Sequence, residues 1–335
     1  MINKTLIIND FELEQGGRLP ELKLAYTTYG EINTDQSNII WVFHALTANS
    51  KVLEWWPGLF GDECMYSPDE YFIICANILG SPYGSSRPED LNFPKITIRD
   101  TVNAQLALAE SLKITKIHTL IGGSCGGSQL LEFAYSYQGQ VNQMITIASA
   151  PKESPWLIAV HQAQRMALEA DPNFGVKSSN TKGLMAARAI GMVTYRTPLS
   201  LMQTQKETEE KFDHFKAASY MQYQGEKFAK RFDAMCYHSL TKCLDTHDLG
   251  RGRGGYQSAL GEIEIPTLVI AIKSDLLIPA FTQSEMASLL PHGVYTEIDS
   301  LYGHDGFLLE VKKITKEITL FYQANAKDGT ILASY

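Results

Sequence analysis

A serine in a glycine-flanked turn is the residue of this chain best placed to do chemistry. Gly122-Gly123-Ser124-Cys125-Gly126 has the form G-x-S-x-G and lies between a run, 116–121, that predicts a buried strand and a run from Gln129 that predicts a helix. So sharp a turn forces the central serine into a strained backbone conformation and exposes its Oγ, and the flanking glycines remove side chains that would collide. The motif predicts Ser124 as a nucleophile.

A serine hydroxyl is a weak nucleophile at neutral pH and needs a base, which in turn needs an orienting acid. Asp275 follows the predicted strand 266–272, and His304 follows the predicted strand 294–299. The order Ser, Asp, His, with each residue in a loop after a strand, is typical of α/β hydrolases. We therefore predict His304 as the general base and Asp275 as the group that holds its tautomer. Considered one at a time, each residue has a second and equally good interpretation: Asp275 as a solvated loop carboxylate and His304 as a residue at a helix N-terminus.

The oxyanion formed during such a reaction needs two backbone N–H donors. One is expected from Cys125, which follows the serine and begins the helix. The other is expected from the loop after an early strand, His-Ala-Leu-Thr at 44–47, where we choose Leu46. Cys125 has a second interpretation, a reactive thiol whose pKa is lowered by the helix N-terminus; we favour a role for its amide alone.

The elements around these residues alternate between strands and helices. Continuous apolar runs such as 38–44 and 266–272 are typical of strands buried on both faces of a parallel sheet. The pattern Thr97–Asp100 is a capping box that opens a helix. The alternation predicts an α/β fold with a mainly parallel, eight-stranded sheet. The strands are expected at 5–9, 21–29, 38–44, 71–77, 116–122, 143–149, 266–272 and 294–299, and the first helix is expected to bury Val102, Leu106, Ala109 and Leu112.

Residues 152–258 interrupt this alternation. They contain helical patterns and many charges but no convincing strand, and strands resume near 265. We predict a helical lid inserted over the carboxyl edge of the sheet, with a core made of 1–151 and 259–335.

Composition limits the class of protein. The 335 residues carry a formal net charge of −8, which argues against a nucleic-acid binder and gives no attraction to anionic membranes. The first ten residues lack the apolar region of a signal peptide, and no apolar run approaches the length of a membrane span. Five cysteines, an odd number without C-x-x-C spacing, predict no disulfide frame. We expect a reduced, cytoplasmic protein.

Cofactor motifs are weak. There is no G-K-[ST], and no G-x-G-x-x-G directly follows a predicted strand, so neither a dinucleotide site nor a P-loop is expected. The segment 245–248, Asp-Thr-His-Asp, contains metal-ligand types without a three-ligand spacing, and we expect no metal site there.

Together these features indicate a resemblance to a known family. The chain resembles the homoserine O-acetyltransferases, the MetX-type branch of the α/β-hydrolase fold, over most of its length. The segments that carry the resemblance are 24–30, 44–47, 55–56, 71–80, 93–100, 122–126, 171–173, 194–196, 223–228, 231–234, 274–275 and 303–308.

The resemblance implies a lid that encloses a tunnel, a homodimer formed through lid helices, and acetyl-CoA as a co-substrate with no permanently bound cofactor. Ser124 would take the acetyl group and release CoA, and a homoserine hydroxyl deprotonated by His304 would then accept it. By the same resemblance, Arg196 matches the arginine that faces the substrate carboxylate, and Asp305 the aspartate that faces its ammonium. From the residues alone, Arg196 is a salt-bridge partner within the lid and Asp305 a helix cap.

Three further arginines have two interpretations. Arg231, Arg251 and Arg253 either meet CoA phosphates at the tunnel mouth or are solvated charges of the lid; the second is favoured.

Departures from the family pattern leave the substrates open. Residues 81–88 replace the family's usual Gly-Cys-x-Gly-Ser/Thr-Thr-Gly-Pro stretch, and 233–237 read Asp-Ala-Met-Cys-Tyr where Asp-Ala-Asn-Ser-Tyr is usual. Acetyl and succinyl donors both stay open, as do homoserine, another hydroxylated acceptor and water. An acetyl-ester hydrolase with the same triad is the main alternative, and a non-catalytic binding protein is a second.

Overall fold

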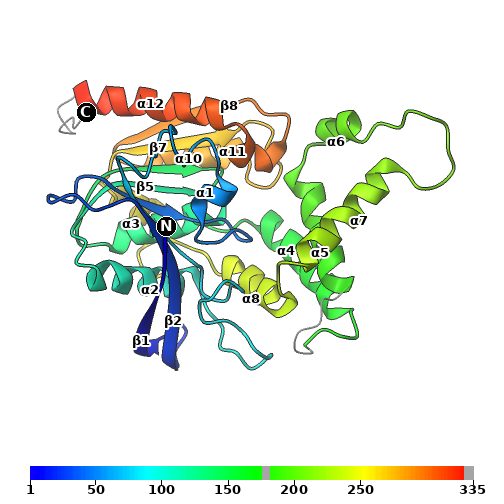
Figure 1. Ribbon diagram of the computed structural model, residues 1–335, viewed down its shortest axis with the longest axis horizontal. Helices are drawn as coiled ribbons and strands as arrows, with labels where there is room; N and C mark the ends of the chain where they lie inside the picture. Colours follow the sequence, from blue (N-terminus) through cyan, green and yellow to red (C-terminus); the bar gives the residue numbers. More distant parts are fainter. Residues whose placement is uncertain (176–181, 328–335) are drawn as a thin grey trace.

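The computed structural model describes residues 1–175 and 182–327, and its centre is an eight-stranded sheet (Figure 1). The strand order is β1-β2-β4-β3-β5-β6-β7-β8. The first two strands form an antiparallel hairpin, β2 pairs antiparallel with β4, and all later neighbours are parallel. The predicted α/β fold is confirmed. The strands are β1 (Ile2–Glu12), β2 (Arg18–Tyr29), β3 (Ile39–Phe43), β4 (Phe72–Ala76), β5 (Lys116–Gly123), β6 (Gln140–Ile147), β7 (Thr267–Ile272) and β8 (Gly293–Ile298).

Helices cover both faces of the sheet, so consecutive residues of its central strands are buried. In β3, Trp41 and Phe43 belong to the core beneath one set of helices, whereas Ile40 and Val42 belong to the core beneath the other. This explains why the sequence shows a continuous apolar run there instead of an alternation. The first face is covered by α2 (Ile98–Ser111), α3 (Cys125–Ser136) and α10 (Ala280–Leu289), and the second by α1 (Val52–Trp55) and α12 (Val311–Lys327).

Helix α2 begins at the predicted capping box. The Thr97 hydroxyl accepts from the Asp100 amide, and the Asp100 carboxylate accepts from the Thr97 amide. The buried face is rotated from the predicted one, because Leu106 and Leu112 are only half-buried while Gln105 is fully buried. Gln105 faces inward because its amide bonds buried side chains on β3 and α3.

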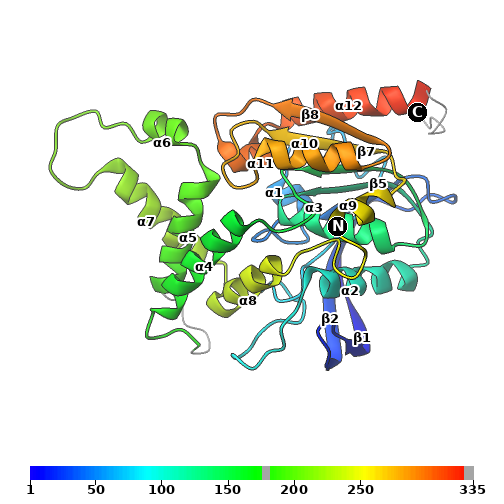
Figure 2. The same ribbon diagram turned by 180° about the vertical axis from the view of Figure 1, so that it is seen from behind.

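A helical region lies between β6 and β7, where the lid is predicted. It comprises α4 (Pro155–Glu169), α5 (Lys182–Tyr195), α6 (Pro198–Thr204), α7 (Lys216–Ala229) and α8 (Ala234–Asp245). Figures 1 and 2 show α5, α6 and α7 projecting away from the sheet, whereas α4 and α8 lie closer to it. The predicted boundary between 258 and 259 falls within α9 (Tyr256–Gly261), which contacts α10 of the core. Residues 176–181 and 328–335 of the predicted domains lie outside the described residues.

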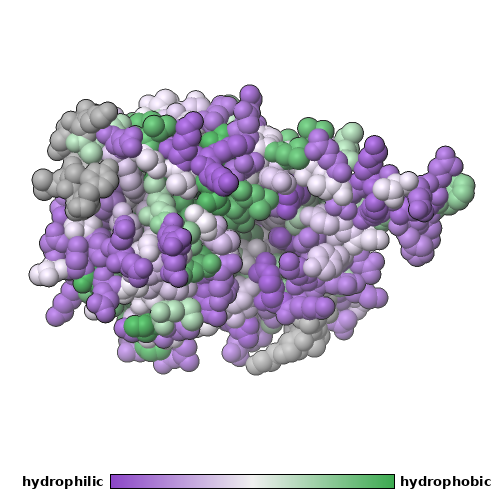
Figure 3. All heavy atoms as spheres, turned by 45° about the horizontal axis from the view of Figure 1, so that its top comes forward, coloured by the Kyte–Doolittle hydropathy of each residue, from purple (hydrophilic) through white to green (hydrophobic). Residues whose placement is uncertain are grey.

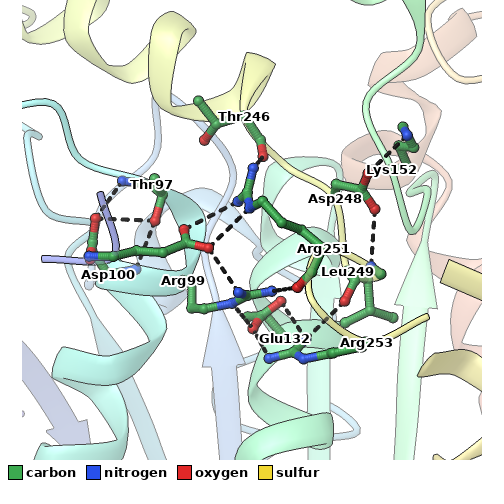
Figure 4. A network of polar contacts seen from close by, with 12 residues as sticks. Thr97, Arg99, Asp100, Glu132, Lys152, Thr246, Asp248, Leu249, Arg251 and Arg253 are labelled. Carbon is green, nitrogen blue, oxygen red and sulfur yellow. Dashed lines mark hydrogen bonds and ion pairs between the residues drawn. The ribbon is translucent and has the colours of Figure 1, made fainter. Parts of the chain in front are cut away.

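An ion-pair network joins the loop that follows α8 to the core (Figure 4). Glu132 of α3, fully buried, binds Arg99 of α2 at 2.7 Å and also binds Arg253. Arg251 binds Glu14 at 3.0 Å. Arg253, whose side chain is 12% exposed, therefore lies within an ion-pair network, and the favoured interpretation of this arginine as a solvated lid charge is wrong. The network fixes the point at which the chain returns from the helical region to the sheet.

Candidate active site

Ser124 occupies a strained turn between β5 and α3, as the motif predicts. Its φ of 56° and ψ of −130° lie outside the regions that residues with a side chain usually adopt. The turn is held because the Ser124 amide donates to Ile147 O at 2.9 Å and Ser149 Oγ donates to Ser124 O at 2.8 Å. A Cβ on Gly126 would collide with the Phe43 carbonyl, so only glycine fits there. The hydroxyl is presented at the carboxyl edge of the sheet.

The structure brings the three predicted catalytic side chains together. His304 Nε2 lies 2.8 Å from Ser124 Oγ, and His304 Nδ1 lies 2.7 Å from Asp275 Oδ2. Asp275 Oδ1 accepts from the amides of Leu277 and Ile278 at 2.7 and 3.0 Å. A carboxylate beside Nδ1 assigns the proton to that nitrogen, which leaves Nε2 free to accept the serine proton. The arrangement can activate the serine.

The electrostatics of His304 suit a general base. Its side chain is 4% exposed and that of Asp275 is fully buried. Burial disfavours the imidazolium, but the charge of Asp275, its hydrogen bond and the charge of Asp305 together raise the pKa of His304 above its ordinary value. The buried carboxylate therefore stabilises the imidazolium that forms when the serine loses its proton.

The two predicted oxyanion donors face the same cavity. Leu46 and Cys125 both line it, next to Ser124. The loop that carries Leu46 is held by His44, whose Nε2 accepts from the Ile78 amide at 3.0 Å and whose carbonyl accepts from Gln129. Burial lowers the pKa of His44 to about 4, so this imidazole stays neutral and can accept that bond. His44 is a positioning residue whose role no sequence motif indicates.

The Cys125 thiol does not fit a reactive role. Burial, and the nearby charge of Glu153, raise the pKa of this thiol to about 12, although a hydrogen bond from Gln129 opposes the shift. A thiol with a raised pKa is not a nucleophile at neutral pH. This favours the interpretation in which only the amide of Cys125 takes part.

A cavity of about 470 Å³ opens above Ser124. It lies between the loops of the core and helices α4 and α5, and Figure 3 shows apolar residues gathered where the helical region meets the core. Its apolar walls include Leu46, Ala150, Leu157, Leu277 and Ile278. A largely apolar pocket with a few polar groups is the usual form of a small-molecule site.

The charged residues of the cavity differ from those predicted. Asp305 lines it, but Arg196 does not; Arg196 Nε instead pairs with Asp305 Oδ2 at 2.9 Å. The arginine that lines the cavity is Arg188, whose guanidinium lies 5.3 Å from the centre of the Tyr195 ring and 5.1 Å from that of Phe228. Arg188 and Tyr195 are seven residues apart on α5, two helical turns, so they share a face. The spacing predicts that Arg188 faces the cavity together with Tyr195, but the sequence alone does not show which face of the helix is the inward one.

Two more charged side chains line the cavity. Arg231 is exposed and donates to Thr47 O and to the Tyr83 hydroxyl, which places a positive charge where the cavity meets solvent. Glu153, in the loop between β6 and α4, is buried. No motif in the sequence pointed to Glu153.

The segment 245–248 serves the fold. Asp245 binds His161 at 2.8 Å and Arg165 at 2.6 Å. His247 is buried beside Ala150 O, and burial lowers its pKa to about 4. Across residues 1–175 and 182–327, no cluster of three or more His, Cys, Asp or Glu side chains is arranged to hold a metal ion. In the same part of the chain, no helix combines the length and apolarity needed to cross a membrane.

The fold and this site define an enzyme of the α/β-hydrolase fold, and a family model described as alpha/beta hydrolase fold matches residues 38–311. A curated homoserine O-acetyltransferase from Cyclobacterium marinum is 44% identical over 93% of each chain. A solved structure of homoserine O-acetyltransferase from Staphylococcus aureus is 30% identical, has a TM-score of 0.83 and covers 97% of this chain and 95% of its own. The chain belongs to the homoserine O-acetyltransferase family and is an acyltransferase. A solved esterase, E22, is similar in fold, with a TM-score of 0.87 at 23% identity, 96% of this chain and 99% of its own being covered.

Proposed function

We propose that the protein transfers an acetyl group from acetyl-CoA to the hydroxyl of homoserine through an acyl-enzyme on Ser124, a reaction of methionine biosynthesis. The observation that carries this proposal is the chain of hydrogen bonds Ser124–His304–Asp275. Ser124 and His304 line a cavity whose wall also contains the guanidinium of Arg188 and the carboxylate of Asp305. The names of the relatives support the same activity.

In the first half of the reaction, Ser124 Oγ attacks the thioester carbonyl while His304 Nε2 takes the hydroxyl proton. The amides of Leu46 and Cys125 stabilise the negative oxygen of the tetrahedral intermediate. The intermediate collapses, the C–S bond breaks, and His304 returns the proton to the leaving CoA sulfur. The acetyl ester on Ser124 remains.

In the second half, the acceptor hydroxyl gives its proton to His304 and attacks the acetyl ester. The same two amides stabilise the second intermediate, and the bond to Ser124 breaks as the serine regains a proton from His304. The lid limits the competing attack of water, because it covers the cavity from which the acceptor approaches.

A zwitterionic acceptor needs a cation and an anion beside the triad. Arg188 offers its guanidinium to the carboxylate, and no acidic side chain in the described part of the chain pairs with it. Asp305 offers its carboxylate to the ammonium, and Arg196 holds it in place. Arg196, matched to the substrate carboxylate by resemblance, thus acts as a positioning residue in this proposal.

The donor enters where Arg231 lies, and this cation favours a donor with phosphates. Acetyl-CoA is a co-substrate, and no permanently bound cofactor takes part. We also propose a cytoplasmic homodimer joined through the lid, on which several large apolar side chains are exposed: Val193, Leu199, Met202, Phe212 and Tyr223.

The test compares CoA release from acetyl-CoA with and without homoserine, with acetate and O-acetylhomoserine quantified by mass spectrometry. We expect CoA release to rise with homoserine in step with O-acetylhomoserine. Release that homoserine does not accelerate, with acetate as the product, would show an ester hydrolase and overturn the proposal. Serine and other hydroxylated amino acids serve as comparison acceptors.

A further inference from the structure

One buried acid in the cavity has no part in the reaction described above. Glu153 is 9% exposed and follows β6 in the loop that passes beside the nucleophile turn. Its backbone is fixed, because its amide donates to His247 O at 2.9 Å. The carboxylate accepts from the Ser154 amide at 3.3 Å, and no lysine or arginine pairs with it within residues 1–175 and 182–327. An acid buried without a cation is costly and calls for an explanation.

Burial and a neighbouring acid both disfavour the ionised form of Glu153. Burial raises the pKa of its carboxyl to about 8, and the charge of Asp245 on α8 adds to the shift, while the Ser154 amide opposes it. Arg165 on α4 is already bound to Asp245 at 2.6 Å, and His161 of the same helix is bound to it at 2.8 Å. Glu153 therefore has no cationic partner among the described residues, and Asp245 itself lies outside the cavity wall.

The chemistry of the site assigns Glu153 to the acyl side. In the tetrahedral intermediate the leaving group must face His304, which protonates it, and the oxyanion must face Leu46 and Cys125. The acyl chain therefore points away from both His304 and the two oxyanion amides. Glu153 lines the cavity and its charge acts on Cys125, whereas the acids that act on His304 are Asp275 and Asp305, so we place Glu153 on the acyl side.

We propose that Glu153 is a specificity-determining residue that confines the transferred acyl group to short, uncharged chains and rejects acyl groups that end in a carboxylate, such as succinyl. This inference rests on the acyl transfer proposed above and names the donor class that the transfer accepts. A succinyl carboxylate in this region would lose its water without gaining a cation, and it would lie beside a second acid. An acetyl group carries no charge and meets neither cost.

The test measures acyl selectivity, defined as the ratio of kcat/KM for acetyl to kcat/KM for succinyl donors. The two CoA thioesters serve for transfer, and p-nitrophenyl acetate and mono-p-nitrophenyl succinate serve for acylation alone. Glu153→Gln removes the charge with little change in shape, and Glu153→Arg supplies a cation. Above pH 8, where Glu153 is ionised, we expect the ratio to fall roughly tenfold or more in Glu153→Gln and further in Glu153→Arg.

Glu54→Gln is the matched control. Glu54 is also a glutamate that lines the cavity, but its side chain is 58% exposed and lies 3.4 Å from Lys51. We expect its acyl selectivity to match that of the unmodified protein. A ratio that stays unchanged in Glu153→Gln, or that falls equally in Glu54→Gln, would overturn the inference. Glu153→Gln keeps the proposal falsifiable if Glu153→Arg fails to fold.

A pH profile separates a charge effect from a merely structural one. The titratable or charged groups on the elements around Glu153 include His161, His247, Asp245, Arg165 and Cys125, together with the ion pair Lys152–Asp248. Glu153 gains its charge as pH rises through about 8, so the unmodified protein should discriminate more strongly against succinyl above that pH. Titration of His304 affects both donors and cancels in the ratio.

The ratio should stay flat with pH in Glu153→Gln, and a parallel rise in both proteins would contradict the inference. The chromogenic esters report selectivity even if no transfer to homoserine occurs, so failure of this inference and failure of the proposed function give different results.

Discussion

Replacement of Asp275 by Asn is the change whose effect on catalysis follows most directly from the geometry. Asp275 Oδ2 accepts from His304 Nδ1, while its Oδ1 accepts from the amides of Leu277 and Ile278. An asparagine oxygen facing those two amides leaves its NH₂ group facing His304. The imidazole must then carry its proton on Nε2, where it can no longer accept the proton of Ser124.

The size of the rate loss follows from the free-energy cost of turning the same asparagine amide into the opposite orientation. An asparagine oxygen turned towards His304 restores the active tautomer, but it leaves the amides of Leu277 and Ile278 buried without an acceptor. Each unsatisfied buried amide costs about 1–3 kcal/mol, so the active orientation lies about 2–6 kcal/mol above the inactive one. At about 1.4 kcal/mol for each factor of ten, the rate of serine acylation should fall between about 30-fold and about 20,000-fold.

The assay is the pre-steady-state burst of p-nitrophenol from p-nitrophenyl acetate, with CoA release from acetyl-CoA measured in parallel across pH. Asp299→Asn is the control, because Asp299 follows β8 with a side chain that is 83% exposed, beside Lys273. We expect Asp299→Asn to keep the burst rate and Asp275→Asn to lose it while keeping the same thermal unfolding midpoint. A loss smaller than about tenfold in Asp275→Asn would refute the orienting role.

Other changes separate the nucleophile, the acceptor site and the ion-pair network. Ser124→Ala should form no covalent acetyl adduct by mass spectrometry, and full retained activity would sink its assignment. Arg188→Gln should raise the KM for homoserine about 10- to 100-fold without slowing the acetylation half-reaction, while Arg196→Gln raises it less; equal effects would contradict the acceptor model. Because neutral His304 is the base and its pKa is raised, acylation should decline as pH falls through a midpoint above 6.5; a midpoint below that value would contradict the mechanism. Glu132→Gln should lower the free energy of unfolding in urea by about 3–5 kcal/mol, since two arginines lose their buried partner, and a change below about 1 kcal/mol would refute that role.

The sheet and the triad could be predicted because both depend on local patterns. Strands buried on two faces give continuous apolar runs, and the chain from 38 to 44 is such a run. Ser124 sits in a turn that needs glycine, and Asp275 and His304 each follow a strand whose carboxyl end lies at the same edge of the sheet. Position along the chain was therefore enough to bring Ser124, Asp275 and His304 together.

The acceptor and acyl sides of the cavity could not be predicted in the same way, because they depend on how the lid helices pack. Arg188 and Arg196 are eight residues apart, and the sequence does not say which one faces the cavity. Helix α5 ends at Tyr195, so Arg196 lies beyond its last turn and meets Asp305, whereas Arg188 shares the inward face with Tyr195. Glu153 belongs to no sequence motif, and only the structure shows that it is buried beside the nucleophile turn.

The central claim is that an acetyl group bound to Ser124 passes to an amino-acid hydroxyl. The most direct measurement isolates the protein after reaction with isotopically labelled acetyl-CoA, adds homoserine, and follows the label from Ser124 into product by rapid quench and mass spectrometry. We expect label to leave Ser124 faster as the homoserine concentration increases and to appear in O-acetylhomoserine. Label that leaves at a rate independent of homoserine and appears only in acetate would contradict it.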